Sequence, residues 1–424
     1  MLLHLKNKNC ISIKIEYGGI EMRKILCVLV AFALLFSSVT NALAEDKIAA
    51  EHYSEDILEG FDAVSTVKLV DGTLDIAAES AVLIEPKTGT VLYEKNRDKQ
   101  LSPASITKIM SLLLIMEAID EGKLKLDTVI TTSEHAASMG GSQIWLEPGE
   151  KMTLDELLKA IVIASANDAT VAVGEAIAGS ETAFVELMNR RAAELSMENT
   201  HFVNCTGLDA EGHVSTAYDV ALMSSELMKH ELITNYSTVW MDTLRDGESQ
   251  LVNTNKLVRF YDGCLGLKTG TTSTAGYCLS AAARRDGTTL IAVVMKGESS
   301  DARFAGARAM LDFGFANYSF MEVSSELQSE TVIGLRGGKK STLRVEAPGT
   351  LSVLSRKGEN EITRQVFLAE ELKAPVAKGT EVGKIVVSLG EEEVGVIPVL
   401  AAETVEKRNV FTVCGWLLRG MFNF

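Results

Sequence analysis

The chain has 424 residues, a formal net charge of -16 and a hydrophobic fraction of 46%. This length suffices for two packed domains, and the excess of Asp and Glu argues against nucleic-acid binding, which needs clustered positive charge. The six cysteines are scattered, with no Cys-x-x-Cys pair and no His-Glu-x-x-His helix. The sequence therefore predicts no disulfide framework, no metal site and no bound cofactor.

Residues 1–44 are typical of an export signal. The basic start Met22-Arg23-Lys24, the apolar run from Ile25 to Phe36 and the small residues up to Ala44 follow the order of a secretory signal peptide. The residues before Met22 extend this signal poorly, so we expect synthesis to begin at Met22. The protein is then exported, and cleavage falls after Ala44.

Residues 45–75 are polar and predict a leader, and residues 76–320 predict an α+β domain. Strands come first, helices dominate the middle and strands return before a last helix, which indicates an antiparallel sheet whose first and last strands meet. We expect strands at 81–85, 90–94, 267–272, 277–284 and 288–294, helices at 154–164 and 181–195, and a final helix at 301–312 stopped by Gly314.

The first chemical signal lies at the start of the helical region. Ser102 and Pro103 suit the N-cap and the first position of a helix. The run that follows, as far as Met116, is apolar on every face, so we expect this helix in the core. Ser105 and Lys108 then share one face, which places a nucleophile beside a candidate base. Alone the pair is a weak signal, because a lysine at a helix entry ordinarily extends to solvent.

Two further motifs make the pair specific. Ser165-Ala166-Asn167 follows an apolar helix, and Lys268-Thr269-Gly270 opens the later strand region. Ser-x-x-Lys, Ser-Asp-Asn and Lys-Thr-Gly in this order form the signature of serine β-lactamases and penicillin-binding proteins, and here Ala166 stands in the variable position of the middle motif. A glycine in such a strand lets a ligand backbone approach closely. An earlier Lys87-Thr88-Gly89 follows a proline, and we interpret it as part of a hairpin turn.

Residues 321–402 show short alternating runs that predict a small all-β domain, which we expect to act as a spacer. The tail, residues 403–424, predicts an amphipathic helix with a broad apolar face. With Arg419 inside it, the helix is too short and too polar to span a bilayer, and it suits the membrane interface with Trp416 near the headgroups. A helix packed on the β domain is the alternative. Strands of this domain are expected at 343–345, 351–354, 365–367 and 384–387.

On these motifs the chain resembles the low-molecular-mass penicillin-binding proteins that act as serine-type D-alanyl-D-alanine carboxypeptidases. Shared stretches include Gly141–Gly149, Gly207–Asp209 and Glu371–Pro375, whereas Cys205 and Leu265 replace a proline and an aspartate that are common there. The resemblance implies a β-lactamase/transpeptidase-like fold, peptidoglycan stem peptides as substrates and β-lactam antibiotics as covalent inhibitors. It also implies work at the outer face of the cytoplasmic membrane or in the cell wall.

The resemblance implies a role for each motif residue. Ser105 attacks the carbonyl of the penultimate D-alanine. Lys108 takes the serine proton, because burial and the facing charge of Lys268 lower its pKa. Ser165 passes protons to the departing amine, and Asn167 orients Lys108 and the substrate amide.

Substrate contacts are implied in the same way. The backbone N–H groups of Ser105 and Thr271 form the oxyanion hole, beside Gly270. Thr269 and Arg303 hold the terminal carboxylate of the substrate. The alternative for Arg303 is a solvated helix arginine, because sequence position alone does not aim a side chain.

Three other readings are weighed against this one. A serine β-lactamase shares the motifs, but no Glu-x-x-Leu-Asn segment lies between Asn167 and Lys268. A non-catalytic penicillin-binding sensor needs a spanning segment, and none follows the signal. An α/β-hydrolase is disfavoured because no Gly-x-Ser-x-Gly is present. A Cys264–Cys278 bridge stays open, although free buried thiols are favoured.

Overall fold

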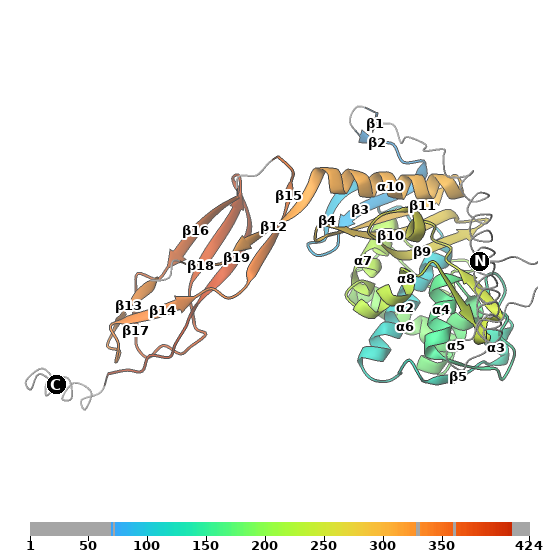
Figure 1. Ribbon diagram of the computed structural model, residues 1–424, viewed down its shortest axis with the longest axis horizontal. Helices are drawn as coiled ribbons and strands as arrows, with labels where there is room; N and C mark the ends of the chain where they lie inside the picture. Colours follow the sequence, from blue (N-terminus) through green and yellow to red (C-terminus); the bar gives the residue numbers. More distant parts are fainter. Residues whose placement is uncertain (1–68, 71–72, 328–330, 359–361, 409–424) are drawn as a thin grey trace, which may run out of the picture. The chain divides into compact units, whose positions relative to one another are not determined.

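The computed structural model describes residues 69–70, 73–327, 331–358 and 362–408 (Figure 1). The expected signal peptide, most of the leader and the expected C-terminal helix beyond residue 408 lie outside these residues. Within the described part, no helix has the length and apolar character needed to cross a membrane. The first described pair is β1 (Leu69–Val70) with β2 (Thr73–Leu74), which run antiparallel.

A five-stranded antiparallel sheet forms the centre of the first domain, in the order β4-β3-β11-β10-β9. Early and late strands meet in it as the sequence predicts, since Val82 lies opposite Val293 in the register of β3 and β11. The sheet therefore closes the domain by joining its two ends. Its strands are β3 (Ala78–Glu85), β4 (Thr90–Lys95), β9 (Cys264–Thr272), β10 (Gly276–Arg285) and β11 (Thr288–Gly297).

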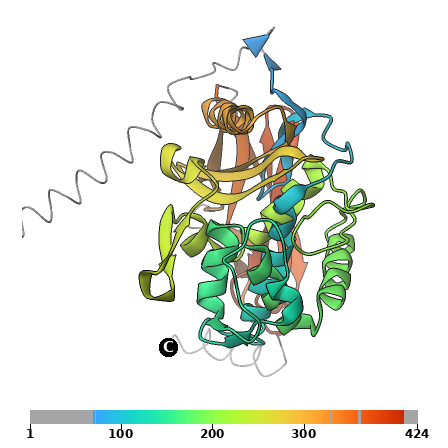
Figure 2. The same ribbon diagram turned by 90° about the vertical axis from the view of Figure 1, so that its right-hand side faces the viewer.

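The two faces of this sheet are covered by different helices (Figure 2). Side chains alternate along a strand, so Val82 packs into the core with α2 (Lys108–Asp120) and α7 (Ala217–Leu227), whereas Leu83 packs into the core with α10 (Ser300–Asn317). The helical cluster thus lies on one face and α10 lies on the other.

The remaining helices and short hairpins complete the cluster. Thr153 and Glu156 form a capping box at the start of α4, and Gly179 ends α5 in the left-handed conformation, with φ 85°. The helices are α3 (Glu134–Ala137), α4 (Leu154–Ile163), α5 (Asn167–Ala178), α6 (Glu181–Glu194), α8 (Thr234–Ser237) and α9 (Leu257–Phe260), with the 3-10 helices η1 (Ala104–Thr107), η2 (Glu231–Ile233) and η3 (Arg245–Gly247). The hairpins pair β5 (Val129–Thr131) with β6 (Lys151–Thr153), and β7 (Met241–Leu244) with β8 (Ser249–Val252).

The entry to the serine helix differs from the prediction. Ser105 lies in η1, and the regular helix α2 begins only at Lys108. Ala104 has φ 49°, so a helix starting at Pro103 cannot run regularly through this point. The Ser102 hydroxyl instead donates to Asp209 Oδ1 at 3.3 Å, and its prediction as the N-cap is wrong.

The expected end of the last helix is also wrong. α10 continues through Gly314 to Asn317. A Cβ on Gly314 would lie 2.4 Å from Leu290 Cδ1 and 3.0 Å from Leu83 Cδ2. The glycine therefore permits close packing of helix on sheet and does not stop the helix.

Beyond α10, the described residues contain β-strands and no helix. β12 (Tyr318–Ser324) pairs with β15 (Thr350–Arg356), and a six-stranded sheet has the order β16-β18-β19-β14-β13-β17. The four expected strands are present, whereas β12, β13, β17 and β19 had no sequence signal that we used. The strands of the larger sheet are β13 (Val332–Arg336), β14 (Thr342–Glu346), β16 (Ile362–Leu368), β17 (Glu371–Lys373), β18 (Glu381–Leu389) and β19 (Glu392–Ala401).

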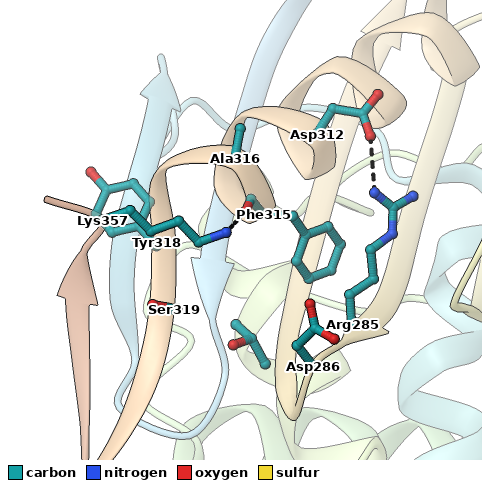
Figure 3. Close-up of a pocket in the computed structure, with 9 residues that line it drawn as sticks. Arg285, Asp286, Asp312, Phe315, Ala316, Tyr318, Ser319 and Lys357 are labelled. Atoms are coloured by element: carbon teal, nitrogen blue, oxygen red, sulfur yellow. Dashed lines mark hydrogen bonds and ion pairs between the residues drawn. The ribbon is translucent and has the colours of Figure 1, made fainter.

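One pocket lies at the end of α10 and the β10–β11 turn (Figure 3). Arg285 and Asp312 approach to 3.5 Å at its rim, and the Tyr261 hydroxyl donates to the same carboxylate at 2.7 Å. None of the residues that line the pocket belongs to the three motifs. The chemistry of the motifs therefore lies elsewhere.

Candidate active site

The serine and the lysine of the first motif are in contact. Lys108 is fully buried, and its Nζ donates to Ser105 Oγ at 3.1 Å, to Asn167 Oδ1 at 2.6 Å and to the Thr206 carbonyl at 2.7 Å. The step from η1 into α2 brings the two side chains together. The arrangement places a nucleophile within hydrogen-bond distance of an amine.

The pKa of the Lys108 amine is lowered, which favours its neutral form. Burial lowers the pKa of Lys108 to about 7, against opposing effects of Cys205 and Asp168. An ordinary lysine has a pKa near 10.4 and stays protonated at neutral pH. Near pH 7, a large fraction of Lys108 is therefore able to accept a proton.

The second motif joins α4 to α5. Asn167 is held from both sides, because its N–H donates to the Ser142 carbonyl at 2.7 Å and its Nδ2 donates to the Gly140 carbonyl at 2.6 Å. Its Oδ1 consequently points at Lys108. Ser165 is buried with φ 64°, and among the described residues its hydroxyl makes no hydrogen bond to Lys108 or Lys268.

The third motif lies on β9, directly against the serine. A Cβ on Gly270 would come within 2.8 Å of Ser105 N and 3.0 Å of Ile106 N. Only a residue without a side chain allows the strand this close to the serine turn. The three segments are thus brought to one place.

Lys268 is the second buried lysine of the site. Burial lowers its pKa well below the ordinary value, and the positive charges of Lys108 and Arg303 lower it further. Its Nζ donates to the Thr269 carbonyl at 3.0 Å. The charge of Lys108 therefore disfavours protonation of Lys268. The pKa of Lys108 itself is lowered by burial, and the expected effect of Lys268 on it stays a prediction.

The residues that are expected to contact the substrate carboxylate lie on or against strand β9. Arg303 Nη1 donates to the Gly270 carbonyl at 3.1 Å and to Thr271 Oγ1 at 2.9 Å, and its Nε is buried with no hydrogen-bond partner among the described residues. Thr269 Oγ1 donates to Thr254 Oγ1 at 2.7 Å. Arg303 is therefore a buried arginine that faces β9, and the solvated alternative is wrong.

Sequence reasoning assigned no role to several residues that shape the site. A Cβ on Gly207, which has φ 84°, would overlap the Ala104 carbonyl oxygen at 1.9 Å. His213 Nδ1 accepts from the Val203 N–H at 2.9 Å, so its Nε2 is free to donate to Thr107 Oγ1 at 2.8 Å. The family resemblance includes the stretch that contains Gly207. The Thr206 carbonyl that accepts from Lys108 belongs to the backbone, so no side chain in the sequence indicates its role.

The described cysteines are free. Cys264 lies on β9 and Cys278 on β10, and neither forms a bridge; Cys205 is free as well. Burial raises the pKa of each of the three thiols, which therefore stay neutral. The favoured expectation of free thiols is confirmed for these three residues.

These contacts define a class of enzyme. A serine hydroxyl beside a partly neutral lysine is an activated nucleophile, and the buried arginine provides a positive site for an anionic substrate group. The fold and the site together are those of a serine enzyme that forms an acyl intermediate.

Comparisons with known proteins give the family. Residues 66–299 match the family model described as D-alanyl-D-alanine carboxypeptidase, and residues 322–407 match that of the penicillin-binding protein 5 C-terminal domain. The chain belongs to the D-alanyl-D-alanine carboxypeptidase family of serine peptidases, as its motifs predict. It is 46% identical over 340 residues to the D-alanyl-D-alanine carboxypeptidase DacF of Bacillus subtilis, covering 79% of this chain and 87% of that protein. Identity to DacC of Escherichia coli is 32%, covering 79% and 86%.

Solved structures agree in fold. Penicillin-binding protein 5 of Haemophilus influenzae aligns with a TM-score of 0.69 and 27% identity, over 79% of this chain and 99% of that chain. Penicillin-binding protein D2 of Listeria monocytogenes, solved in an ampicillin-bound form, aligns with a TM-score of 0.53 and 31% identity, over 57% and 99%.

Proposed function

We propose that Ser105 is the nucleophile with which this carboxypeptidase removes the terminal D-alanine from peptidoglycan pentapeptides. One observation carries the proposal. The Gly270 segment of β9 lies against the Ser105 backbone, so that two buried lysines and the serine share one site. The D-alanyl-D-alanine substrate follows from the family.

Acylation begins with Lys108 in its neutral form. Its Nζ takes the proton of Ser105 Oγ, and Oγ forms a bond to the carbonyl carbon of the penultimate D-alanine. The C–N bond to the terminal D-alanine then breaks, and the proton that Lys108 took from Ser105 passes through Ser165 to the leaving amine, which leaves Lys108 neutral again. Burial keeps a large fraction of Lys108 neutral before the attack. Lys268 lies in the same site as a second buried amine.

The developing oxyanion needs preorganised donors. The N–H groups of Ser105 and Thr271 supply them, since Gly270 lets β9 approach the serine. Arg303 and Thr269 hold the substrate carboxylate. The Nε of Arg303, which has no hydrogen-bond partner in the part of the chain that the structure describes, supports this role as an available donor. Water then hydrolyses the acyl-serine.

β-Lactams mimic the scissile amide and acylate the same serine in this proposal. The ampicillin-bound form of the Listeria relative supports it. A serine β-lactamase is the alternative, and the lifetime of the penicillin adduct separates the two readings. An adduct that turns over in seconds indicates the lactamase, and a long-lived adduct indicates the carboxypeptidase.

Location is the second part of the proposal. Residues 1–44 contain the export signal, with synthesis beginning at Met22. Residues 45–75 lead into the catalytic domain at 76–320. Residues 321–402 act as a spacer. Residues 403–424 then attach the enzyme to the outer face of the membrane as an amphipathic helix. Removal of residues 409–424 is expected to release the protein from vesicles that contain anionic lipid.

The test of the catalytic proposal uses a pentapeptide that ends in D-Ala-D-Ala. Wild type, Ser105→Ala and the control Ser102→Ala are incubated with it, and free D-alanine is measured. Release by wild type and by Ser102→Ala, but not by Ser105→Ala, supports the proposal. Equal release by Ser105→Ala and wild type overturns it.

A further inference from the structure

One turn of chain, residues 204–207, supports both members of the Ser-Lys pair. The Thr206 carbonyl accepts from Lys108 Nζ at 2.7 Å, as one of the three partners of that amine. The next residue, Gly207, packs under the serine, because a Cβ there would lie 2.9 Å from Ser105 N. A displacement of this turn therefore moves the amine and the serine backbone together.

The turn is held from inside by a side chain of its own. Asn204 Oδ1 accepts from the Gly207 N–H at 2.7 Å, and from the N–H and hydroxyl of Thr206 at 3.2 Å each. Its Nδ2 donates to the Leu208 carbonyl at 2.8 Å. These bonds shape the turn. They do not fix its position relative to the helices.

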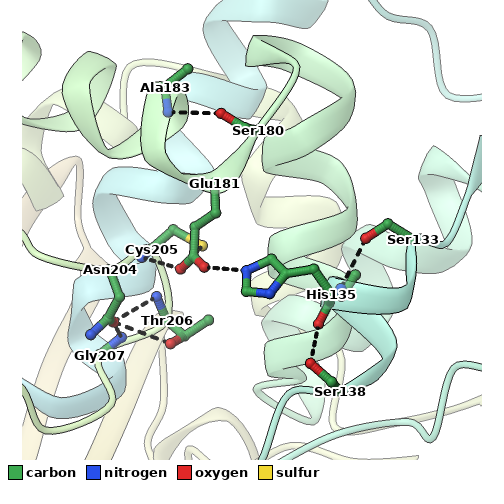
Figure 4. A network of polar contacts seen from close by, with 11 residues as sticks. Ser133, His135, Ser138, Ser180, Glu181, Ala183, Asn204, Cys205, Thr206 and Gly207 are labelled. Carbon is green, nitrogen blue, oxygen red and sulfur yellow. Dashed lines mark hydrogen bonds and ion pairs between the residues drawn. The ribbon is translucent and has the colours of Figure 1, made fainter.

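The turn is tied to the helical cluster by Glu181, at the start of α6 (Figure 4). Glu181 Oε1 accepts from the Cys205 N–H at 3.2 Å and from the Cys205 thiol at 3.4 Å. Its Oε2 lies 2.7 Å from His135 Nε2. Figure 4 shows the carboxylate between the imidazole and the turn, so both of its oxygens are engaged.

The environment of Glu181 suits a fixed anion. Its side chain is 17% exposed, and it sits in the first turn of a helix, where backbone N–H groups favour negative charge. Burial raises the pKa of Cys205, so its thiol keeps the hydrogen that it donates. The Cys205 carbonyl accepts from Ser111 Oγ of α2 at 2.7 Å. The Cys205 backbone is thus bonded to α6 on one side and to α2 on the other.

We propose that Glu181 is a positioning residue for catalysis, which holds the 204–207 turn through the Cys205 N–H so that the Thr206 carbonyl keeps Lys108 beside Ser105. The inference rests on the proposed function, in which Lys108 is the base. His135 fixes the orientation of the carboxylate. A proline at position 205 has no N–H to donate, so this device requires a different residue there.

The test compares Glu181→Ala and Glu181→Gln with wild type and with Glu186→Gln, which changes an exposed carboxylate on the same helix. The rate of acylation by a fluorescent penicillin is normalised to the amount bound at completion, which removes the effect of unfolded protein. We expect Glu181→Ala to be slower by roughly tenfold or more, because the loss of hydrogen bonds to a charged group frees the turn. Glu181→Gln keeps an acceptor oxygen and recovers most of the rate.

A pH profile separates positioning from a merely structural role. If the Thr206 carbonyl leaves Lys108, the protonated amine loses a partner, and the acidic limb of the acylation profile of Glu181→Ala moves to lower pH. The other titratable groups that act on the pKa of Lys108 are Asp168 and Cys205. Asp168 is unchanged in this variant, and Cys205 keeps its hydrogen because burial is the largest cause of its raised pKa. An acidic limb at the wild-type pH contradicts the proposal.

A second variant tests the route through the backbone. Cys205→Pro removes the N–H group that donates to Glu181. The double variant Cys205→Pro/Glu181→Ala is therefore expected to lose as much acylation rate as either single variant. Additive losses overturn the proposal, as do equal rates for Glu181→Ala and wild type. If wild type itself shows no acylation that Ser105→Ala abolishes, the proposed function fails instead, so the two failures are distinguishable.

Discussion

Lys108 and Asn167 lie 59 positions apart in the sequence, yet Lys108 Nζ donates to Asn167 Oδ1 at 2.6 Å. The amide is held in this orientation by the Gly140 carbonyl, which accepts from its Nδ2. The lysine amine is thus kept at the serine by groups that come from three separate segments of the chain.

The pH dependence of acylation is expected to report on Lys108. Its pKa is lowered to about 7, so the neutral amine becomes the major form as the pH rises through 7. The rate of acylation by penicillin should therefore rise with pH around this value and level off above it. Stopped-flow rates between pH 5 and 9 provide the measurement, with Lys108→Ala as the inactive control. A flat wild-type profile contradicts the assignment of the base.

The two Lys-Thr-Gly stretches of this chain form a matched pair. Lys268 is buried beside the serine turn, whereas Lys87 is exposed in the hairpin turn before β4. We expect Lys268→Ala to slow acylation by roughly a hundredfold or more, because the second amine of the site is lost. Lys87→Ala should acylate like wild type. Labelling of both variants with fluorescent penicillin makes the comparison, and a loss in Lys87→Ala alone would reverse the assignment.

His213 is expected to make the folded protein less stable in acid. Burial lowers its pKa from 6.5 to about 4, so below pH 6.5 the unfolded chain binds a proton that the folded chain does not. Above pH 6.5 this group leaves the free energy of unfolding unchanged. The free energy of unfolding falls as the pH decreases below that value, and near pH 4 the titration of His213 has lowered it by about 3 kcal/mol. Urea unfolding at several pH values measures the slope. His213→Gln should show a shallower slope over this range, and an unchanged slope would refute the prediction.

Gly314→Ala is expected to destabilise the protein although it replaces a glycine inside a helix. Alanine gains about 1 kcal/mol of helix propensity. Its Cβ, however, would lie 2.4 Å from Leu290 Cδ1, and overpacking of this kind costs about 1–3 kcal/mol. We predict a net loss of about 1 kcal/mol in urea unfolding. Acylation should be retained, since α10 covers the face of the sheet opposite to α2, and a more stable variant would contradict the packing argument.

Several features could be predicted because their causes are local. The continuous apolar run from Ala81 to Ile84 is typical of a strand that is buried on both faces, and the order of the three motifs indicates the family. The N-cap role of Ser102 failed, because the left-handed backbone at Ala104 interrupts the helix. The predicted helix end at Gly314 is wrong because this glycine lies inside a continuous helix and packs against the sheet. A glycine signal does not distinguish a helix end from a close contact with a sheet.

The sequence by itself determined which residue types were available, namely two serines, two lysines and an asparagine in a recognisable order, and strand patterns at both ends of the helical region. Only the tertiary structure decided that burial lowers the pKa of Lys108 to about 7, that a backbone carbonyl accepts from its amine and that Glu181 bonds to the turn carrying that carbonyl. The reason is physical. Strand and turn propensities depend on neighbours in sequence, whereas burial and hydrogen-bond partners depend on segments that meet only when the chain has folded.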